Sequence, residues 1–97
     1  VVVGQVLALH PPRGRDAARP QPVLIVSPTY YGACGDVATI AQLAHQHNLP
    51  LLVDEAHGAH FAFHPDLPTP ALVAGADVAV QSIHKTLTAM TQAAMLH

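Results

Sequence analysis

The sequence predicts an α/β fold built on a mainly parallel sheet. Three short runs of aliphatic and β-branched residues, 23–26, 51–53 and 77–81, alternate with helical or irregular segments. Strands that alternate with helices are joined by crossover connections and therefore run parallel. Of the 97 residues, 51% are hydrophobic and only 10% are charged. The charged fraction is far below the usual quarter, so much of the surface is expected to be covered by other protein.

The sequence starts with an apolar run that ends at two prolines. Val1 to Leu9 is apolar at nearly every position and favours a helix over a strand. Pro11 and Pro12 end this element, because neither can continue a helix. Residues 13–22 contain all three arginines and are expected to form an exposed loop with no assigned function.

The first predicted βαβ unit runs from Val23 to Asp54. Residues 23–26 form a buried parallel strand, followed by a loop at 27–32. Asp36 is placed to cap a helix, whose apolar face recurs at helical spacing from Val37 to about His47. Residues 48–50 end the helix, and the next strand closes at Asp54.

The remaining elements are shorter. Residues 61–70 contain three prolines and are expected to be irregular. Residues 71–74 predict a short helix ended by Gly75, and residues 77–81 predict a third strand. Residues 90–96 are apolar and favour a fourth strand over a helix.

Bulk properties exclude several classes of function. The net charge of −2 leaves no basic patch for nucleic acid. No apolar run approaches the roughly 18 residues of a membrane span, and no signal peptide is recognisable. The single cysteine, Cys34, excludes an internal disulfide and fits a reducing compartment, so a cytoplasmic location is expected. Both ends look cut, which predicts a fragment of a larger domain.

Polar residues follow three of the predicted strands. The clusters span Ser27–Gly32, Asp54–His60 and Ser82–Lys85. The carboxyl ends of parallel strands meet at one edge of a sheet, where ligands of α/β proteins bind. The three clusters together therefore predict a ligand site.

Lys85 is the only lysine of the chain and comes just after the third strand. A serine, a histidine and two threonines lie near it, so its amine is expected to be kept partly out of water. Desolvation disfavours the ammonium form and frees the amine as a nucleophile. The alternative is an ordinary solvated surface lysine.

Asp54 offers a carboxylate at the neighbouring strand end. One interpretation is a helix cap or a structural, hydrogen-bonded aspartate. The other is a carboxylate that keeps a ligand's ring nitrogen protonated. A site for pyridoxal 5'-phosphate (PLP) needs at least a lysine that binds the carbonyl group of the cofactor and an aspartate that pairs with the pyridinium nitrogen of the cofactor. Ser82 and His84 are then expected to serve its phosphate, with His57 near its ring.

A metal site and a cysteine nucleophile are not predicted. His57, His60 and His64 would share one face of a helix, but Gly58 and the prolines that follow argue against a helix here. The spacing does not match the His-Glu-x-x-His motif of zinc enzymes. Cys34 has no obvious activating partner.

Three stretches together resemble a known family. They are Ser27-Pro28-Thr29-Tyr30-Tyr31-Gly32, Val53-Asp54-Glu55-Ala56-His57-Gly58-Ala59-His60 and Gln81-Ser82-Ile83-His84-Lys85. They are similar to the large domain of the PLP-dependent ornithine/lysine/arginine decarboxylases over residues 23–97. The Asp-x-Ala-His motif lies 31 residues before the lysine, and this combination makes the resemblance specific. The resemblance implies part of the three-layer, mainly parallel sheet of a fold type I PLP-dependent transferase.

The resemblance also implies a role for each matching residue around the ring. Lys85 matches the Schiff-base lysine, and Asp54 matches the partner of the pyridine nitrogen. Ala56 matches a small residue packed against one face of the ring, and His57 a histidine beside the cofactor. Lys85, Asp54 and His57 are the implied catalytic residues.

Other matching residues lie around the phosphate and its loops. Ser82 and His84 match residues near the phosphate, and Thr29 falls in a loop that approaches the cofactor. An upstream phosphate loop, a group that stacks on the other face of the ring and a carboxy-terminal domain are expected to lie outside the 97 residues.

The implied reaction is decarboxylation of lysine, arginine or ornithine to the corresponding amine by a parent enzyme. The 97 residues alone are expected to be inactive, and the parent is expected to be a homo-oligomer. Another fold type I reaction, such as transamination or aldol cleavage, is one alternative. A truncated, non-catalytic relic is the other.

Overall fold

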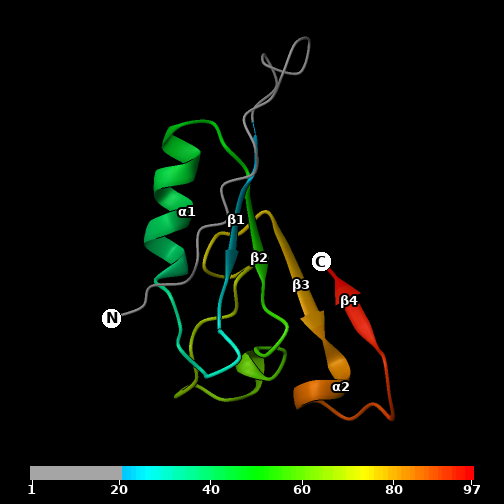
Figure 1. Ribbon diagram of the computed structural model, residues 1–97. Helices are drawn as coiled ribbons and strands as arrows, with labels where there is room; N and C mark the ends of the chain where they lie inside the picture. Colours follow the sequence, from blue (N-terminus) through cyan, green and yellow to red (C-terminus); the bar gives the residue numbers. More distant parts are fainter. Residues whose placement is uncertain (1–20) are drawn as a thin grey trace.

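The computed structural model describes residues 21–97 as one four-stranded sheet with the strand order β1-β2-β3-β4 (Figure 1). The expectations for residues 1–20 lie outside the described residues. The strands are β1 (Val23–Val26), β2 (Leu51–Asp54), β3 (Val78–Ser82) and β4 (Ala94–Leu96). The helices are α1 (Val37–Gln46), α2 (Ile83–Thr86) and the 3-10 turn η2 (Phe61–Phe63). Among these helices none is long and apolar enough to cross a membrane.

Strands β1, β2 and β3 are parallel, as predicted. Asp54, the last residue of β2, lies opposite both Val26, the last residue of β1, and Val80, and β3 continues to Ser82. Their carboxyl ends therefore point to one edge, where α2 and the connecting loops lie (Figure 1). Strand β4 pairs antiparallel with β3, so the predicted fourth strand is confirmed in a shorter form.

Asp36 caps helix α1, as predicted. The Asp36 carboxylate accepts hydrogen bonds from the Thr39 amide at 3.0 Å and the Thr39 hydroxyl at 2.7 Å. These bonds satisfy one of the free amides of the first turn and lower the pKa of Asp36. The helix ends by Asn48, whose φ of 56° leaves the helical region.

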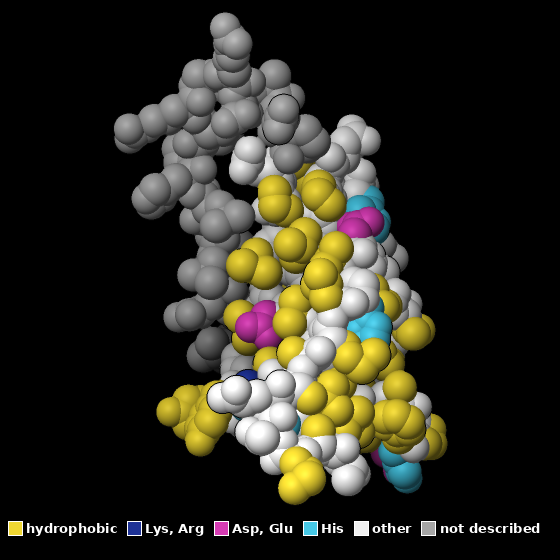
Figure 2. Space-filling view, turned by 90° about the vertical axis from the view of Figure 1, so that its right-hand side faces the viewer, with side chains coloured by type: hydrophobic (Ala, Val, Ile, Leu, Met, Phe, Trp, Pro, Cys, Tyr) yellow, Lys and Arg dark blue, Asp and Glu magenta, His cyan; other side chains and the backbone are white. Residues whose placement is uncertain are grey.

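The hydrophobic core lies on one face of the sheet only. Alternate strand residues meet α1 and the segment 71–76 there. The buried core consists of Ile25, Val37, Ala41, Ala44, Leu51, Val53, Ala71, Ala76 and Ala79. The strand residues between these point to the opposite face, which the described residues leave partly open. On the side of the molecule away from α1, hydrophobic side chains gather around an acidic one (Figure 2).

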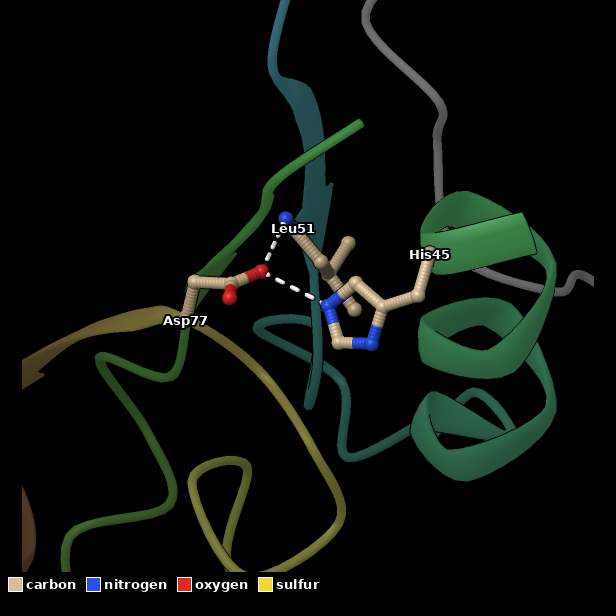
Figure 3. A network of polar contacts seen from close by, with 3 residues as sticks. All are labelled: His45, Leu51 and Asp77. Atoms are coloured by element: carbon tan, nitrogen blue, oxygen red, sulfur yellow. Dashed lines mark hydrogen bonds and ion pairs between the residues drawn. The ribbon is translucent and has the colours of Figure 1, made fainter. Parts of the chain in front are cut away.

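The entry into β2 and β3 is fixed by Asp77 (Figure 3). Asp77 Oδ2 accepts hydrogen bonds from the Leu51 amide at 2.7 Å and from His45 Nε2 at 2.9 Å. The bond from His45, and then the one from Leu51, hold the pKa of the Asp77 carboxyl below its usual value. One carboxylate therefore joins the last turn of α1 to two neighbouring strands.

Three local expectations need correction. Residues 71–74 do not form a helix, because Gly75 at φ 109° ends the segment after one turn. The Ala76 amide donates to the Ala71 carbonyl and the Gly75 amide to the Leu72 carbonyl, which is the bonding of a Schellman turn.

The stretch 61–70 is irregular except for η2, and the third strand begins at Val78 rather than Asp77. The one-turn helix α2 is not predicted by the sequence.

Candidate active site

The three polar clusters meet at the carboxyl edge of β1, β2 and β3. Backbone hydrogen bonds extend the sheet beyond the strands themselves. The Ser27 amide donates to the Asp54 carbonyl at 3.0 Å, and the Glu55 amide donates to the Val80 carbonyl at 2.8 Å. The loops that leave the three strands therefore start side by side, as the sequence predicts.

Asp54 is the last residue of β2 and is partly buried. Its Oδ1 accepts a hydrogen bond from the Ala56 amide at 3.0 Å. Its Oδ2 makes no hydrogen bond to any residue of the described range. With Val26 and Val80, Asp54 lines a hollow of about 250 Å³ on the open face of the sheet. One carboxylate oxygen is thus fixed and the other is available to a ligand.

Glu55 points the other way and is only 2% exposed. Its Oε1 accepts from the Ala71 amide at 2.8 Å, and its Oε2 accepts from Gln81 Nε2 at 2.6 Å. Gln81 Oε1 in turn accepts from His97 Nε2 at 3.1 Å. Adjacent acids therefore lie in different environments, Asp54 toward the open face and Glu55 inside the protein.

Lys85 lies on α2, immediately after β3. The expectation that its amine is kept partly out of water is wrong for the described structure, because Lys85 is exposed. The reason is that α2 is a single turn with no buried residue. Lys85 makes no ion pair or hydrogen bond within residues 21–97, so its amine is uncommitted.

Ser82 and His84 flank the start of α2. Ser82 is the N-cap residue, yet its hydroxyl makes no capping hydrogen bond. His84 Nδ1 lies 3.0 Å from the Ala93 carbonyl oxygen. A carbonyl only accepts, so Nδ1 is the donor, and Nε2 of the neutral ring carries a lone pair. His84 can therefore donate to a second group only as the imidazolium cation.

The loop after β1 brings an aromatic ring to His57. Thr29 closes this loop, since its hydroxyl oxygen accepts from the Ala33 amide at 3.1 Å and its amide donates to the Ala33 carbonyl at 2.8 Å. The next residue, Tyr30, meets the His57 ring edge to face at a centroid distance of 5.6 Å and an interplanar angle of 89°. Thr29 and His57 thus belong to loops in direct contact.

No group of three or more His, Cys, Asp or Glu side chains is placed to hold a metal within the described part of the chain. His60 instead stacks edge to face on Phe61, with 5.0 Å between the ring centroids. Desolvation, followed by the charge of Glu55, raises the pKa of the Cys34 thiol. This shift favours the unreactive thiol form of Cys34.

Sequence reasoning missed Glu55 and Tyr30 as parts of the site. Leu51 and Val53 are buried, and Glu55 continues this alternation toward the covered side of the sheet. That two-residue spacing was the available signal for a buried glutamate. No sequence signal places Tyr30 against His57, because the contact depends on the path of the loop.

The described residues fit PLP in their chemistry. An uncommitted amine at Lys85, a free carboxylate oxygen at Asp54 and an unused hydroxyl at Ser82 lie at neighbouring strand ends. Ala56, whose side chain is a single methyl group, lies next to Asp54 and is partly buried. A hollow of about 520 Å³ lined by residues 61–73 contains none of these groups and is not part of the site.

Comparisons with known proteins identify a family for this sequence. The sequence model of the Orn/Lys/Arg decarboxylase major domain matches residues 5–97. An arginine decarboxylase of Bacillus cereus is 48% identical over 75 residues, and one of Bacillus subtilis is 47% identical over the same length. One from Halalkalibacterium halodurans is 44% identical over 75 residues.

The matched segment covers 77% of this chain and 15–16% of each of these relatives. The relatives are therefore several times longer than the region compared. The family match extends over nearly the whole sequence, including the three strand-end clusters. The chain belongs to the Orn/Lys/Arg decarboxylase family.

Proposed function

We propose that this chain is part of the PLP-binding domain of an enzyme that decarboxylates a basic amino acid to its amine. The observation that carries the proposal is the pairing of Asp54 and Lys85. Asp54 ends β2 and Lys85 comes three residues after the end of its parallel neighbour β3, and each has a polar atom without a partner among the described residues. An unpaired carboxylate oxygen and an uncommitted amine are what the two ends of the cofactor ring require.

Each residue of the site has a separate task. Lys85 would supply the amine that holds the aldehyde of the cofactor. Asp54 Oδ2 would accept a hydrogen bond from the protonated ring nitrogen, while the Ala56 amide keeps Oδ1 in place. His57, supported by Tyr30, lies beside the ring, and Ala56 packs against it. Ser82 and His84 would donate to the phosphate, and Thr29 closes the loop that would approach the cofactor.

The chemistry is divided between cofactor and protein. When bound, PLP accepts the electron pair that remains at the α-carbon after CO₂ departs. The negative charge of Asp54 favours the protonated ring nitrogen, because opposite charges stabilise each other. Lys85 would hold the cofactor through its amine, and once the substrate amine took that place, the free Lys85 side chain, after taking up a proton, could return it to the α-carbon.

The wider architecture is also part of the proposal. The open face of the sheet would be covered by a further helical layer, which gives the three-layer fold type I domain. Arginine is the substrate in the names of the relatives from Bacillus cereus and Bacillus subtilis, so it is the first of the three basic amino acids to test. The parent is proposed to be a cytoplasmic homo-oligomer, and the low charged fraction supports a largely covered surface.

The test uses the full-length protein that carries this chain. Borohydride reduction in the presence of PLP should leave a cofactor adduct on the peptide that contains Lys85. The matched variant Lys85→Arg keeps the charge but should give no adduct. Incubation with arginine, lysine or ornithine should release CO₂ and one amine with no keto acid.

Two results would contradict the proposal. A keto acid or an aldehyde in place of CO₂ would indicate transamination or aldol cleavage on the same pair. A folded full-length protein with no adduct on Lys85 would remove the cofactor assignment and leave a non-catalytic protein.

A further inference from the structure

Glu55 occupies an unusual position for a charged residue. It is only 2% exposed, and burying a carboxylate is costly unless it is hydrogen-bonded. Both of its oxygens have partners, and these come from distant parts of the sequence. Ala71 lies 16 residues along the chain and Gln81 lies 26 residues along it.

The polarity of this network is fixed by the carboxylate. An ionised carboxylate only accepts, so Gln81 must turn its NH₂ group to Glu55 and its carbonyl oxygen to His97. His97 Nε2 must then be a donor. The single charge of Glu55 therefore orients its own side chain just after β2, Gln81 on β3 and His97 just after β4.

The network joins the two halves of the candidate site. Glu55 is the neighbour of Asp54 in the sequence, and Gln81 precedes Ser82 and α2, which carries Lys85. The 2.6 Å bond between Glu55 and Gln81 therefore joins the residue just after β2 to the penultimate residue of β3. The helix α2 has no buried residue of its own to fix its position.

We propose that Glu55 is a positioning residue that, through Gln81, holds α2 and Lys85 at a fixed distance from Asp54. This inference rests on the proposed function, because it assumes that Lys85 and Asp54 serve one cofactor. Neither Glu55 nor Gln81 touches the reacting atoms.

The experiment exchanges the two network partners in the full-length protein. Gln81→Glu places two carboxylates against each other and should push α2 away. The double variant E55Q/Q81E restores every hydrogen bond of the pair with its polarity reversed. The amide introduced at position 55 would donate to the carboxylate introduced at position 81 and still accept from the Ala71 amide. Gln42→Glu, on the exposed side of α1, is the control for an added charge.

The primary readout is the rate at which the apoprotein incorporates PLP, followed by borohydride trapping on Lys85. Well below each variant's unfolding temperature, Gln81→Glu should slow incorporation and reduce kcat by about 100-fold, as expected for a misplacement near 1 Å, with KM little changed. The double variant should recover to within about 10-fold of the wild type, and Gln42→Glu should match the wild type.

Two outcomes would overturn the inference. One is a Gln81→Glu variant that incorporates PLP at the wild-type rate, and the other is a folded double variant that stays as slow as the single one. If Gln81→Glu does not fold, Gln81→Met takes its place, since it keeps the length and removes the donor. A wild-type protein that forms no adduct would instead reject the proposed function, so the two failures are distinguishable.

Discussion

Gly58 lies against Glu55 so closely that a Cβ atom on Gly58 would be 2.6 Å from Glu55 Cγ. The same atom would be 2.9 Å from Phe61 Cε2 and 3.0 Å from Pro28 Cδ. The Gly58 amide also donates to the Glu55 carbonyl at 2.9 Å, so the loop turns directly around the buried carboxylate. Only glycine leaves room for this turn.

Gly58→Ala should therefore destabilise the protein by about 1–3 kcal/mol, the usual cost of overpacking a filled site. The measurement is the free energy of unfolding of the full-length protein from a denaturant titration. Gly32→Ala is the matched comparison, because Gly32 has a φ of 83° but nothing within 4 Å of its Cβ position. Its cost should be about 1 kcal/mol from the backbone alone. A Gly58→Ala variant as stable as the wild type would contradict the steric argument.

Asp54→Asn should reduce decarboxylation by about 100- to 1000-fold, on the scale of losing one preorganised electrostatic group. The amide cannot stabilise a protonated ring nitrogen by charge, while it still accepts from the Ala56 amide. The PLP adduct on Lys85 should persist, since that amine is unchanged. CO₂ release and borohydride trapping measure the two effects. Asp66→Asn, on the exposed loop, is the control and should leave both unchanged.

Asp77 should contribute to stability in a pH-dependent way. Hydrogen bonds from His45 and Leu51 lower its pKa in the folded protein below the ordinary value of 3.8. A carboxyl whose pKa is lower in the folded state stabilises the protein above its unfolded pKa. This contribution is lost as the pH falls through the lowered pKa.

The check compares wild type with Asp77→Asn by denaturant titration across the acid range. The wild type should be more stable above about pH 4, and the difference should shrink as the pH is lowered further. A difference that does not change with pH would show that the Asp77 charge is not responsible. The exposed Asp66 again provides the control substitution to Asn.

Tyr30→Ala should weaken PLP binding by about 2- to 10-fold, because aromatic pairs contribute about 0.5–1.5 kcal/mol beyond their area. The loss comes from the His57 ring, which would no longer be braced by its edge-to-face neighbour. Tyr30→Phe keeps the ring and should bind PLP as the wild type does. Equilibrium titration of the apoprotein with PLP gives the affinities. If Tyr30→Phe is as weak as Tyr30→Ala, the hydroxyl rather than the ring is the important group.

The two nitrogens of His84 can be tested separately. His84→Asn places an amide NH₂ near the position of Nδ1, so it can keep the bond to the Ala93 carbonyl while losing Nε2. It should bind PLP about 10- to 100-fold more weakly, the range for one hydrogen bond to a charged group. His84→Gln reaches the Nε2 position and should recover part of this affinity. If binding is unchanged in His84→Asn, His84 does not contact the phosphate.

The parts of the fold that the sequence predicts correctly depend on local signals. The cap at Asp36, the apolar spacing of α1 and the three β-branched runs each act within a few residues. The expected helix at 71–74 is wrong because its apolar residues also suit a Schellman turn, and the φ of Gly75 decides between them. The meeting of the three polar clusters was predictable because the carboxyl ends of parallel strands point to the same edge of the sheet.

The exposure of Lys85 and the hydrogen-bond partners of Glu55 and His84 could not be predicted in the same way. Whether Lys85 is covered depends on which elements pack on α2, and a one-turn helix carries no periodicity to indicate this. The bond from Glu55 to Gln81 joins residues 26 positions apart, so no local pattern predicts it. The bond between His84 and Ala93 likewise depends on the return of the chain into β4.

Asp54 and Glu55 are neighbours with opposite surroundings, and this makes the length of β2 as important as its composition. Successive side chains of a strand point to opposite faces of the sheet, so the number of residues before each acid decides which one lies on the open face and which one in the interior. A single deleted or inserted codon in β2 would exchange the two assignments while leaving both acids in place. Among relatives of this chain, substitutions in the strand can be neutral, but gaps of one residue there are expected to be purged by selection.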